Sequence, residues 1–340
     1  MISHRPYRQR ASSFNHSIQH KPKSRRPSYD VVTKKKSTPF LAIEQQSSTL
    51  IGHASSIDES FSDEEVPQTG SEKDQYGFLK STQWITEEEH DEFENYYAPI
   101  MKRRSEKWKQ LLNDHHQQWP PRSSKLKRYI RKGIPSELRG QAWLHYSGAK
   151  SKMESNQGIY NDLLKESNRL GSQNENLEII ERDLHRTFPE NIRFKTITQG
   201  ETPEIIQSLK RVLLAFSLYS PSIGYCQSLN YIAGLLLLFM SEEEAFWSLV
   251  TLIHEILPPN IYDVTMEGAN IDQNVLMHLV SERYPLVWNK ISPNQTFWQC
   301  EEQMEGGMPA CSLVTSHWFL TLFINILPIE SVLRVWDCLF

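Results

Sequence analysis

The chain has 340 residues, of which 39% are hydrophobic and 23% charged, and its formal net charge is −4. This composition is typical of soluble proteins that bury a core, and the near-neutral balance disfavours a globally basic nucleic-acid binder. The longest apolar runs, Tyr231–Met240 and Trp318–Leu327, have ten residues each, about half of what a membrane-spanning helix needs. We therefore expect a soluble protein whose contact with membranes is at most peripheral.

The four cysteines, at positions 226, 300, 311 and 338, form neither a CxxC pair nor a zinc-binding spacing. This pattern favours a reducing compartment in which the thiols serve as small core residues. The N-terminus shows no apolar segment of the kind found in secretory signal peptides. Together these features predict a cytoplasmic location.

The first 75 residues are predicted to be a disordered, Ser-rich tail. They contain 14 serines, and their basic and acidic residues are grouped in separate blocks. A basic block, Lys21–Lys36, precedes an acidic block, Asp58–Glu65, and no apolar period persists that could offset chain entropy. Ser28 follows a basic stretch and Ser62 precedes an acidic one, so both are candidate phosphorylation sites. The alternatives are a plain solvated linker and a basic run that contacts anionic lipid.

Residues 76–124 are predicted to be a helical lead-in. Ile85 to Leu112 is typical of a charged helix with scattered apolar positions, and Trp119-Pro120-Pro121 ends it. The basic stretch Lys125–Lys132 that follows is interpreted as a solvated helix face.

Residues 125–340 are predicted to form one all-α domain of about ten helices joined by short connections, because helical periodicity recurs and no alternating strand pattern is found. Apolar residues at Ile205, Leu209, Val212, Leu213 and Phe216 form one helical stripe that begins after Pro203. Further helices are expected over Tyr225–Met240, from the Ser241–Glu244 capping box onward, over Asp272–Ile291, and over Ser312–Leu327 before Pro328.

Three local patterns in this domain combine polar residues with core anchors. The first is Gly133-Ile134-Pro135 followed by Leu138-Arg139-Gly140 and Trp143. The second runs from Ile180 to Pro189, with Asp183 and Arg186 three residues apart on one helix and Arg186 in its last turn. The third, Gly224 to Asn230, opens an apolar helix and is expected to place Gln227 and Asn230 on one face.

These patterns together resemble the TBC domain, the all-helical module of GTPase-activating proteins for Rab-type small GTPases. The resemblance covers about residues 129–340. It extends to Asp272-Gln273, Tyr284-Pro285, Trp318-Phe319-Leu320 and the segment Ser331 to Asp337. It implies a GTPase activator that works in vesicle trafficking and supplies catalytic residues to its partner. The GTPase, rather than this chain, would be the enzyme.

The resemblance implies that Arg186 is an arginine finger and that Gln227 is a glutamine finger. A permanently charged guanidinium neutralises charge on a γ-phosphoryl transition state, and a carboxamide orients the attacking water. Asp183, Tyr225 and Asn230 are interpreted as supporting residues. Arg139 is interpreted as holding helices together rather than contacting nucleotide.

The resemblance also implies a Rab GTPase in its GTP form as partner, with GTP and magnesium bound by that partner. No GxxxxGK[ST] phosphate-binding loop occurs in the sequence, so no cofactor of its own and no metal are expected. His115-His116 is a poor metal site, because it lies in a polar helix. Peripheral association with endomembranes or the plasma membrane is expected to occur through the Rab.

Simpler interpretations of the two fingers remain open. Arg186 could be an ordinary surface ion pair with Asp183, Gln227 could be a solvated amide, and the chain could be a TBC-like scaffold that binds a partner without catalysis. A cysteine hydrolase based on Cys226 is set aside, since no orienting histidine is evident.

Two departures from the family pattern bear on activity. Ser228 stands where the family usually has glycine after the finger glutamine, which matters only if the backbone there needs a positive φ. The sequence also stops at Phe340, whereas the family's domain normally continues for several helices. A fragment, a truncated gene model or an isoform, with an incompletely covered apolar face, is therefore expected.

Overall fold

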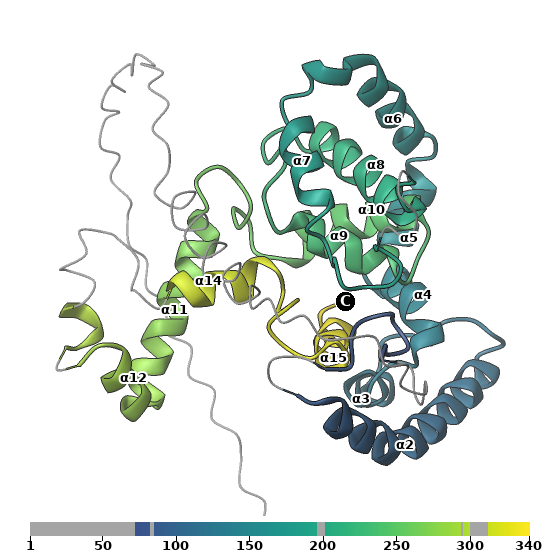
Figure 1. Ribbon diagram of the computed structural model, residues 1–340. Helices are drawn as coiled ribbons and strands as arrows, with labels where there is room; N and C mark the ends of the chain where they lie inside the picture. Colours follow the sequence, from purple (N-terminus) through teal and green to yellow (C-terminus); the bar gives the residue numbers. More distant parts are fainter. Residues whose placement is uncertain (1–71, 82–84, 196–200, 294, 300–311) are drawn as a thin grey trace, which may run out of the picture. The chain divides into compact units, whose positions relative to one another are not determined.

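The computed structural model describes residues 72–81, 85–195, 201–293, 295–299 and 312–340, and these are largely helical (Figure 1). Within these ranges the β structure is confined to isolated bridge residues, among them the antiparallel bridge between Lys73 and Leu79. The predicted all-α class is therefore confirmed. Residues 1–71 of the predicted tail, which include Ser28 and Ser62, lie outside the described residues. None of the helices in these ranges is both long and apolar enough to cross a bilayer.

The α-helices of the described residues comprise α2 in the predicted lead-in and, from α3 onward, those of the domain for which about ten were predicted. In chain order they are α2 (Glu87–Asp114), α3 (Ser124–Lys132), α4 (Ser136–Tyr146), α5 (Ala149–Ser155), α6 (Ile159–Leu170), α7 (Leu177–Leu184), α8 (Glu204–Tyr219), α9 (Leu229–Leu237), α10 (Glu242–Thr251), α11 (Glu267–Arg283), α12 (Pro285–Ile291), α14 (Ser312–Leu320) and α15 (Ile329–Leu339). A 3₁₀ turn spans Gly171–Gln173 and a π-helical turn spans Leu252–Ile256.

Capping boxes fix the start of two helices. The Thr86 hydroxyl accepts from the Glu89 N–H at 3.2 Å and the Glu89 carboxylate accepts from the Thr86 N–H at 3.0 Å, so α2 begins at Glu87. Ser241 and Glu244 form the same arrangement at the start of α10, as predicted. Each box satisfies backbone donors that would otherwise have no partner within the helix.

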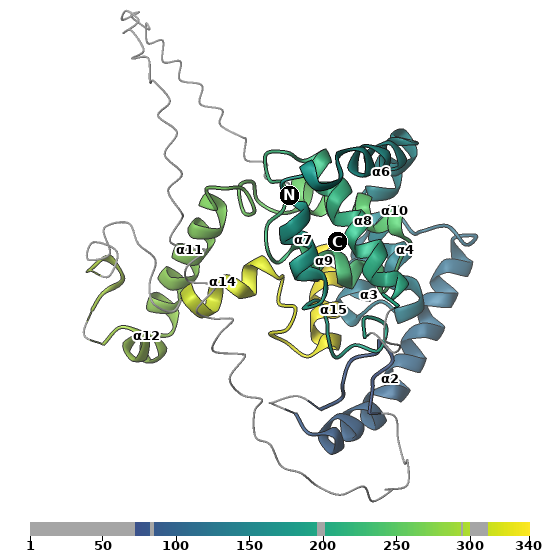
Figure 2. The same ribbon diagram turned by 45° about the horizontal axis from the view of Figure 1, so that its top comes forward.

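The core is built around α8, α9 and α10, which pack against one another (Figures 1 and 2). Leu209, Val212 and Phe216 of the predicted stripe are completely buried. The first position of that stripe was assigned wrongly: Ile205 is half-buried, whereas its neighbour Ile206 is buried. The stripe therefore enters the core one residue later than the spacing suggested.

Three expected helices are shorter than predicted. The stretch Asp272–Ile291 is two helices, α11 and α12, because Pro285 restricts Tyr284 to non-helical conformations and starts the second helix. The helix expected over Ser312–Leu327 ends at Leu320. Leu322, Phe323 and Asn325 all have positive φ, which an α-helix does not accommodate.

The third shortened helix is α9, expected from Tyr225 but beginning at Leu229. The side-chain oxygen of Asn176 accepts from the Tyr225 N–H at 3.0 Å, which holds Tyr225 in a non-helical segment. Ser228, with φ of 99°, separates this segment from the helix. Gln227 therefore lies in the turn before α9 and not on its first turn.

A buried ionic cluster joins α4 to α15. The Arg139 guanidinium is completely buried, 3.2 Å from the Asp337 carboxylate and 2.8 Å from that of Glu330. Asp337 also accepts from the Trp143 indole at 3.1 Å and the Ile134 N–H at 2.9 Å. Burial raises the pKa of Asp337, with Arg139 and the hydrogen bonds opposing the rise. Arg139 thus offsets the negative charge of two carboxylates, and these ion pairs connect α4 with α15.

Replacing Arg139 with leucine is expected to lower the free energy of unfolding by about 3–5 kcal/mol, because the Asp337 charge would stay buried without its cation. Chemical denaturation would measure the change. Lys165→Ala is the control, since its ion pair with Asp162 is exposed and should contribute almost nothing. If the two variants unfolded at the same denaturant concentration, the buried cluster would not be stabilising in the way described.

Candidate functional site

Arg186 lies immediately beyond the end of α7. The sequence predicted Arg186 in the last turn of the helix. This prediction is wrong, because the helix ends at Leu184 and Arg186 lies in the turn that follows. The Thr187 hydroxyl donates to the Asp183 carbonyl at 2.7 Å and thereby satisfies an acceptor that the ending helix leaves free. The Arg186 side chain is 39% exposed. The arginine is therefore presented on a loop that is tied back to its helix.

Asp183 holds Arg186 from beneath. Its carboxylate is almost completely buried and lies 2.6 Å from a guanidinium nitrogen of Arg186. The Tyr225 hydroxyl donates to its other oxygen at 2.5 Å. Burial raises the pKa of Asp183, while Tyr225 and Arg186 act in the opposite direction. Burial, together with the Asp183 charge, raises the pKa of Tyr225 far above its ordinary value, so the phenol remains the donor.

Gln227 is the second candidate residue, and its carboxamide is available for a partner. The residue is half-buried in the turn before α9. Its side chain has no hydrogen-bond partner within the described part of the chain. The expectation that Gln227 and Asn230 share a helical face is wrong, because only Asn230 is helical.

Asn230 instead joins the two loops from inside. It is completely buried, its amide donates to the Thr187 hydroxyl at 2.8 Å, and its oxygen accepts from the Ser228 N–H at 3.2 Å. The Tyr231 hydroxyl also donates to the Arg186 carbonyl at 3.4 Å. The turn that holds Gln227 is thus bonded to the loop that holds Arg186.

Sequence reasoning missed Thr187 and Asn176 as members of this network. Thr187 directly follows Arg186, and threonine side chains often bond a backbone carbonyl three or four residues earlier in competition with the helical pattern. That signal was present in the sequence. Asn176 acts on Tyr225 from 49 residues away in the chain, and no local pattern indicates such a contact.

Ser228 has a backbone conformation that suits glycine. Its φ is 99° and its ψ is −30°, and the residue is buried. A side chain in this region costs of order 1–3 kcal/mol. The position therefore meets the condition under which the substitution of serine for the usual glycine has a cost, and the strain lies directly beside Gln227.

Replacing Ser228 with glycine is expected to raise the free energy of unfolding by about 1 kcal/mol, since relief of strain exceeds the added freedom of the unfolded chain. Thermal or chemical unfolding would measure the gain. Ser228→Ala keeps the Cβ atom and should give no such increase. A loss of stability in the glycine variant, or an equal gain in both variants, would contradict the strain interpretation.

The remaining candidates lie elsewhere or have other partners. Arg139 contacts Asp337 and Glu330 rather than the two loops. Cys226 is half-buried, with its sulfur 3.3 Å from the Gln227 carbonyl oxygen.

A group of possible metal ligands forms on α2, where donor atoms of His90, Asp91 and Glu94 lie within 4.8 Å of one another. The Lys80 ammonium is 2.7 Å from Asp91 and 3.5 Å from Glu94. This ammonium already compensates the carboxylates, so the group gives no support for a metal site.

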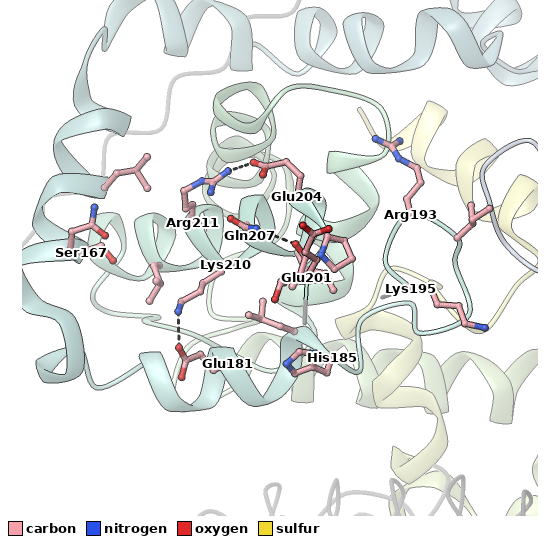
Figure 3. Close-up of a pocket in the computed structure, with 18 residues that line it drawn as sticks. Ser167, Glu181, His185, Arg193, Lys195, Glu201, Glu204, Gln207, Lys210 and Arg211 are labelled. Carbon is pink, nitrogen blue, oxygen red and sulfur yellow. Dashed lines mark hydrogen bonds and ion pairs between the residues drawn. The ribbon is translucent and has the colours of Figure 1, made fainter. Parts of the chain in front are cut away.

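A cavity of about 1320 Å³ lies between α6, α7 and α8 (Figure 3). Two cations in its lining are already paired: Lys210 with Glu181 at 2.6 Å and Arg211 with Glu204 at 2.8 Å. The lining also contains Arg193, which donates to the Leu238 carbonyl at 3.1 Å, and Lys195. Neither candidate finger lines this cavity. The two candidate side chains therefore lie outside this pocket, although His185 and Arg193 of the loop that follows α7 line it.

The comparisons with known proteins bear on the family and on the all-helical fold of this chain. The family model described as the Rab-GTPase-TBC domain matches residues 136–340. The chain therefore belongs to the Rab-GTPase-TBC domain family.

Two relatives come from Saccharomyces cerevisiae. The chain is 44% identical over 299 residues to the GTPase-activating protein GYP3 and 42% identical over 287 residues to the GTPase-activating protein MSB4, each match covering 78% of this chain. The matches cover 47% and 58% of those proteins, so the chain spans about half the length of these yeast relatives.

A human relative and a solved structure extend the comparison. Growth hormone-regulated TBC protein 1 of Homo sapiens is 39% identical over 269 residues, with 78% of this chain and 72% of that protein covered. The crystal structure of the Chlamydomonas flagellar RabGAP TBC domain matches with a TM-score of 0.60 and 27% identity, covering 78% of this chain and 80% of that one. The family's helical fold is therefore shared by this chain.

Proposed function

We propose that this chain is a GTPase-activating protein for a Rab-type small GTPase and that it supplies Arg186 and Gln227 in trans. The observation that carries the proposal is the bonding of the two loops through Asp183, Thr187 and Asn230. These loops carry a partly exposed guanidinium and a carboxamide that has no hydrogen-bond partner among the described residues. The family membership and the GTPase-activating names of the yeast relatives support the same activity.

The chemistry of the two side chains suits this role. Charge develops on the phosphoryl oxygens as GTP is hydrolysed, and a guanidinium placed there neutralises it without any change of protonation. A carboxamide both donates and accepts, so it can orient the attacking water without titrating. Asp183 fixes the guanidinium on one side and leaves its remaining N–H donors for the phosphate.

The GTPase is the enzyme in this scheme, and the present chain is its activator. GTP and magnesium belong to the partner, so the chain would need no cofactor of its own. We propose that it acts in vesicle trafficking from the cytoplasm and reaches endomembranes or the plasma membrane through the Rab. No nucleic acid is involved.

A panel of purified Rab proteins tests the proposal. Single-turnover GTP hydrolysis should be faster with the 340-residue chain for at least one Rab, and binding should prefer the GTP form. The alternative, a scaffold that binds without catalysis, draws on the strained serine beside Gln227. It predicts binding with an unchanged hydrolysis rate on every Rab of the panel. That result would contradict the activator proposal and support the scaffold alternative.

A further inference from the structure

A compact turn precedes α2 and carries two aromatic side chains; we name residues 72–81 the strap. One carboxylate oxygen of Asp74 accepts from the Tyr76 and Phe78 N–H groups at 2.8 and 2.9 Å. The Gly77 N–H donates to the Asp74 carbonyl at 3.1 Å, and Gly77 has φ of 89°. The strap is therefore a defined turn with its own internal hydrogen bonds.

The strap is bonded to the loop that carries Arg186; we name residues 185–195 the arginine loop. The Ile192 N–H donates to the Gly77 carbonyl at 3.0 Å, and the Asn191 amide donates to the Tyr76 carbonyl at 3.1 Å. The Lys73 ammonium donates to the Glu190 carbonyl at 2.5 Å. Three consecutive residues of the arginine loop are thus attached to a segment more than 100 positions earlier in the chain.

Phe78 extends this attachment toward the arginine itself. Its ring meets the Phe188 ring edge-on, with centroids 5.2 Å apart and an angle of 90° between the planes. Phe188 is only two residues from Arg186, has φ of 49° and is buried, and its ring also contacts those of Phe194 and Tyr231. Phe78 is therefore one of three aromatic residues that pack around Phe188 and hold the arginine loop in its conformation.

The other end of the strap is anchored in the core. The Tyr76 hydroxyl donates to Glu330 at 2.8 Å and accepts from Arg139 at 2.5 Å, and its ring packs against Phe239 with centroids 5.5 Å apart. Glu330 belongs to α15, Arg139 to α4, and Phe239 to the turn that follows α9. The strap consequently connects the buried ionic cluster to the arginine loop.

We infer that the strap positions Arg186 and that Phe78 is a positioning residue for the arginine finger. Arg186 stands on non-helical backbone, and its loop is held by α7 on one side and by the strap on the other. A catalytic group displaced by about 1 Å can lose about 10²-fold in rate, so a loose loop would lower turnover while leaving the docking surface intact. The inference rests on the proposed function for its effect on catalysis, although the mechanical connection stands by itself.

Hydrogen–deuterium exchange of the full chain, with no GTPase present, tests the mechanical connection. Phe78→Ala should raise exchange in peptides that cover 185–195. Gly77→Val should do so too, because its Cβ would lie 2.8 Å from the Ile192 side chain at a φ that disfavours side chains. Trp119→Ala is the matched control, since Trp119 is also half-buried and meets Tyr146 edge-on. Unchanged exchange of the arginine loop in both strap variants would overturn the inference.

Steady-state activation of a Rab that responds to the wild-type chain tests the catalytic consequence. Phe78→Ala should lower kcat about tenfold with KM within twofold of wild type, and Phe78→Leu should restore part of the loss by refilling the space. Trp119→Ala should leave kcat unchanged. A rise in KM alone, or equal losses in the Phe78 and Trp119 variants, would show a general effect on folding and would overturn the positioning role.

The two proposals fail in different ways. If Arg186→Ala left activation intact, the finger assignment would be wrong, whatever the exchange experiment showed. If Arg186→Ala abolished activation but Phe78→Ala changed neither exchange nor kcat, the proposed function would stand and the strap would not be a positioning element.

Discussion

Replacing Arg186 with alanine is expected to reduce Rab activation by at least about 10³-fold. An arginine finger contributes about 10³–10⁵ in rate, or about 4–7 kcal/mol of the barrier, because it meets charge that develops only in the transition state. The loss should therefore fall on kcat, while KM and binding of the GTP form change little. Single-turnover hydrolysis with saturating chain would measure it.

A neighbouring arginine provides the control for this experiment. Arg182 lies on α7, four residues before Arg186, and its ion pair with Glu178 is exposed. Arg182→Ala should keep nearly full activity, since such pairs contribute little. Arg186→Lys should stay well below wild type, because an ammonium lacks the planar fork of donors. Equal activity of the Arg182 and Arg186 variants would reduce Arg186 to an ordinary partner of Asp183.

Replacing Gln227 with alanine is expected to lower activation by about 10²-fold or more, since the attacking water would lose its orientation. The carboxamide has no partner in the described structure, so its removal leaves no buried polar group unsatisfied and should leave the melting temperature unchanged. Hydrolysis rates and thermal unfolding measured on the same preparation would separate a catalytic loss from a structural one.

Gln207 offers a matched glutamine on α8. Its side-chain amide donates to the Thr202 carbonyl at 3.1 Å at an exposed position. Gln207→Ala should activate the Rab as well as wild type does. Gln227→Glu should be as defective as Gln227→Ala, because a carboxylate has no N–H donor and would repel the phosphate. Full activity of both Gln227 variants would remove this residue from the mechanism.

Local signals in the sequence predicted much of the fold. The capping box of Ser241 and Glu244 predicted the start of α10. The apolar stripe after Pro203 predicted α8, and only its first buried position was wrong, by one residue. Both depend on contacts between residues three or four positions apart, which a sequence displays directly.

Features set by distant contacts were not predictable in the same way. Nothing near Tyr225 indicates that Asn176 accepts its N–H and delays the start of α9, and nothing near Arg186 indicates that residues 76–78 bond its loop. The positive φ of Ser228 is a third example, because the side chain itself favours the opposite sign. The candidate site was therefore predictable in residue identity but not in how its parts are held.

Ser228 also affects how strongly this chain should act. Ser228 lies between Gln227 and α9 with a positive φ, and its N–H donates to the Asn230 side-chain oxygen, so removal of its side chain should relieve strain without loss of this hydrogen bond. The stabilising effect expected for Ser228→Gly should therefore be accompanied by activation at least as strong as that of the wild-type chain.

The most direct test of the central claim uses a responsive Rab whose own catalytic glutamine has been replaced by alanine. If this chain supplies both catalytic side chains, single-turnover hydrolysis by that Rab should still be accelerated by the wild-type chain to nearly the normal extent, and the Gln227→Ala chain should fail to accelerate it. Loss of acceleration by the wild-type chain on this Rab would show that the water is oriented by the GTPase, and the two-residue mechanism would be contradicted.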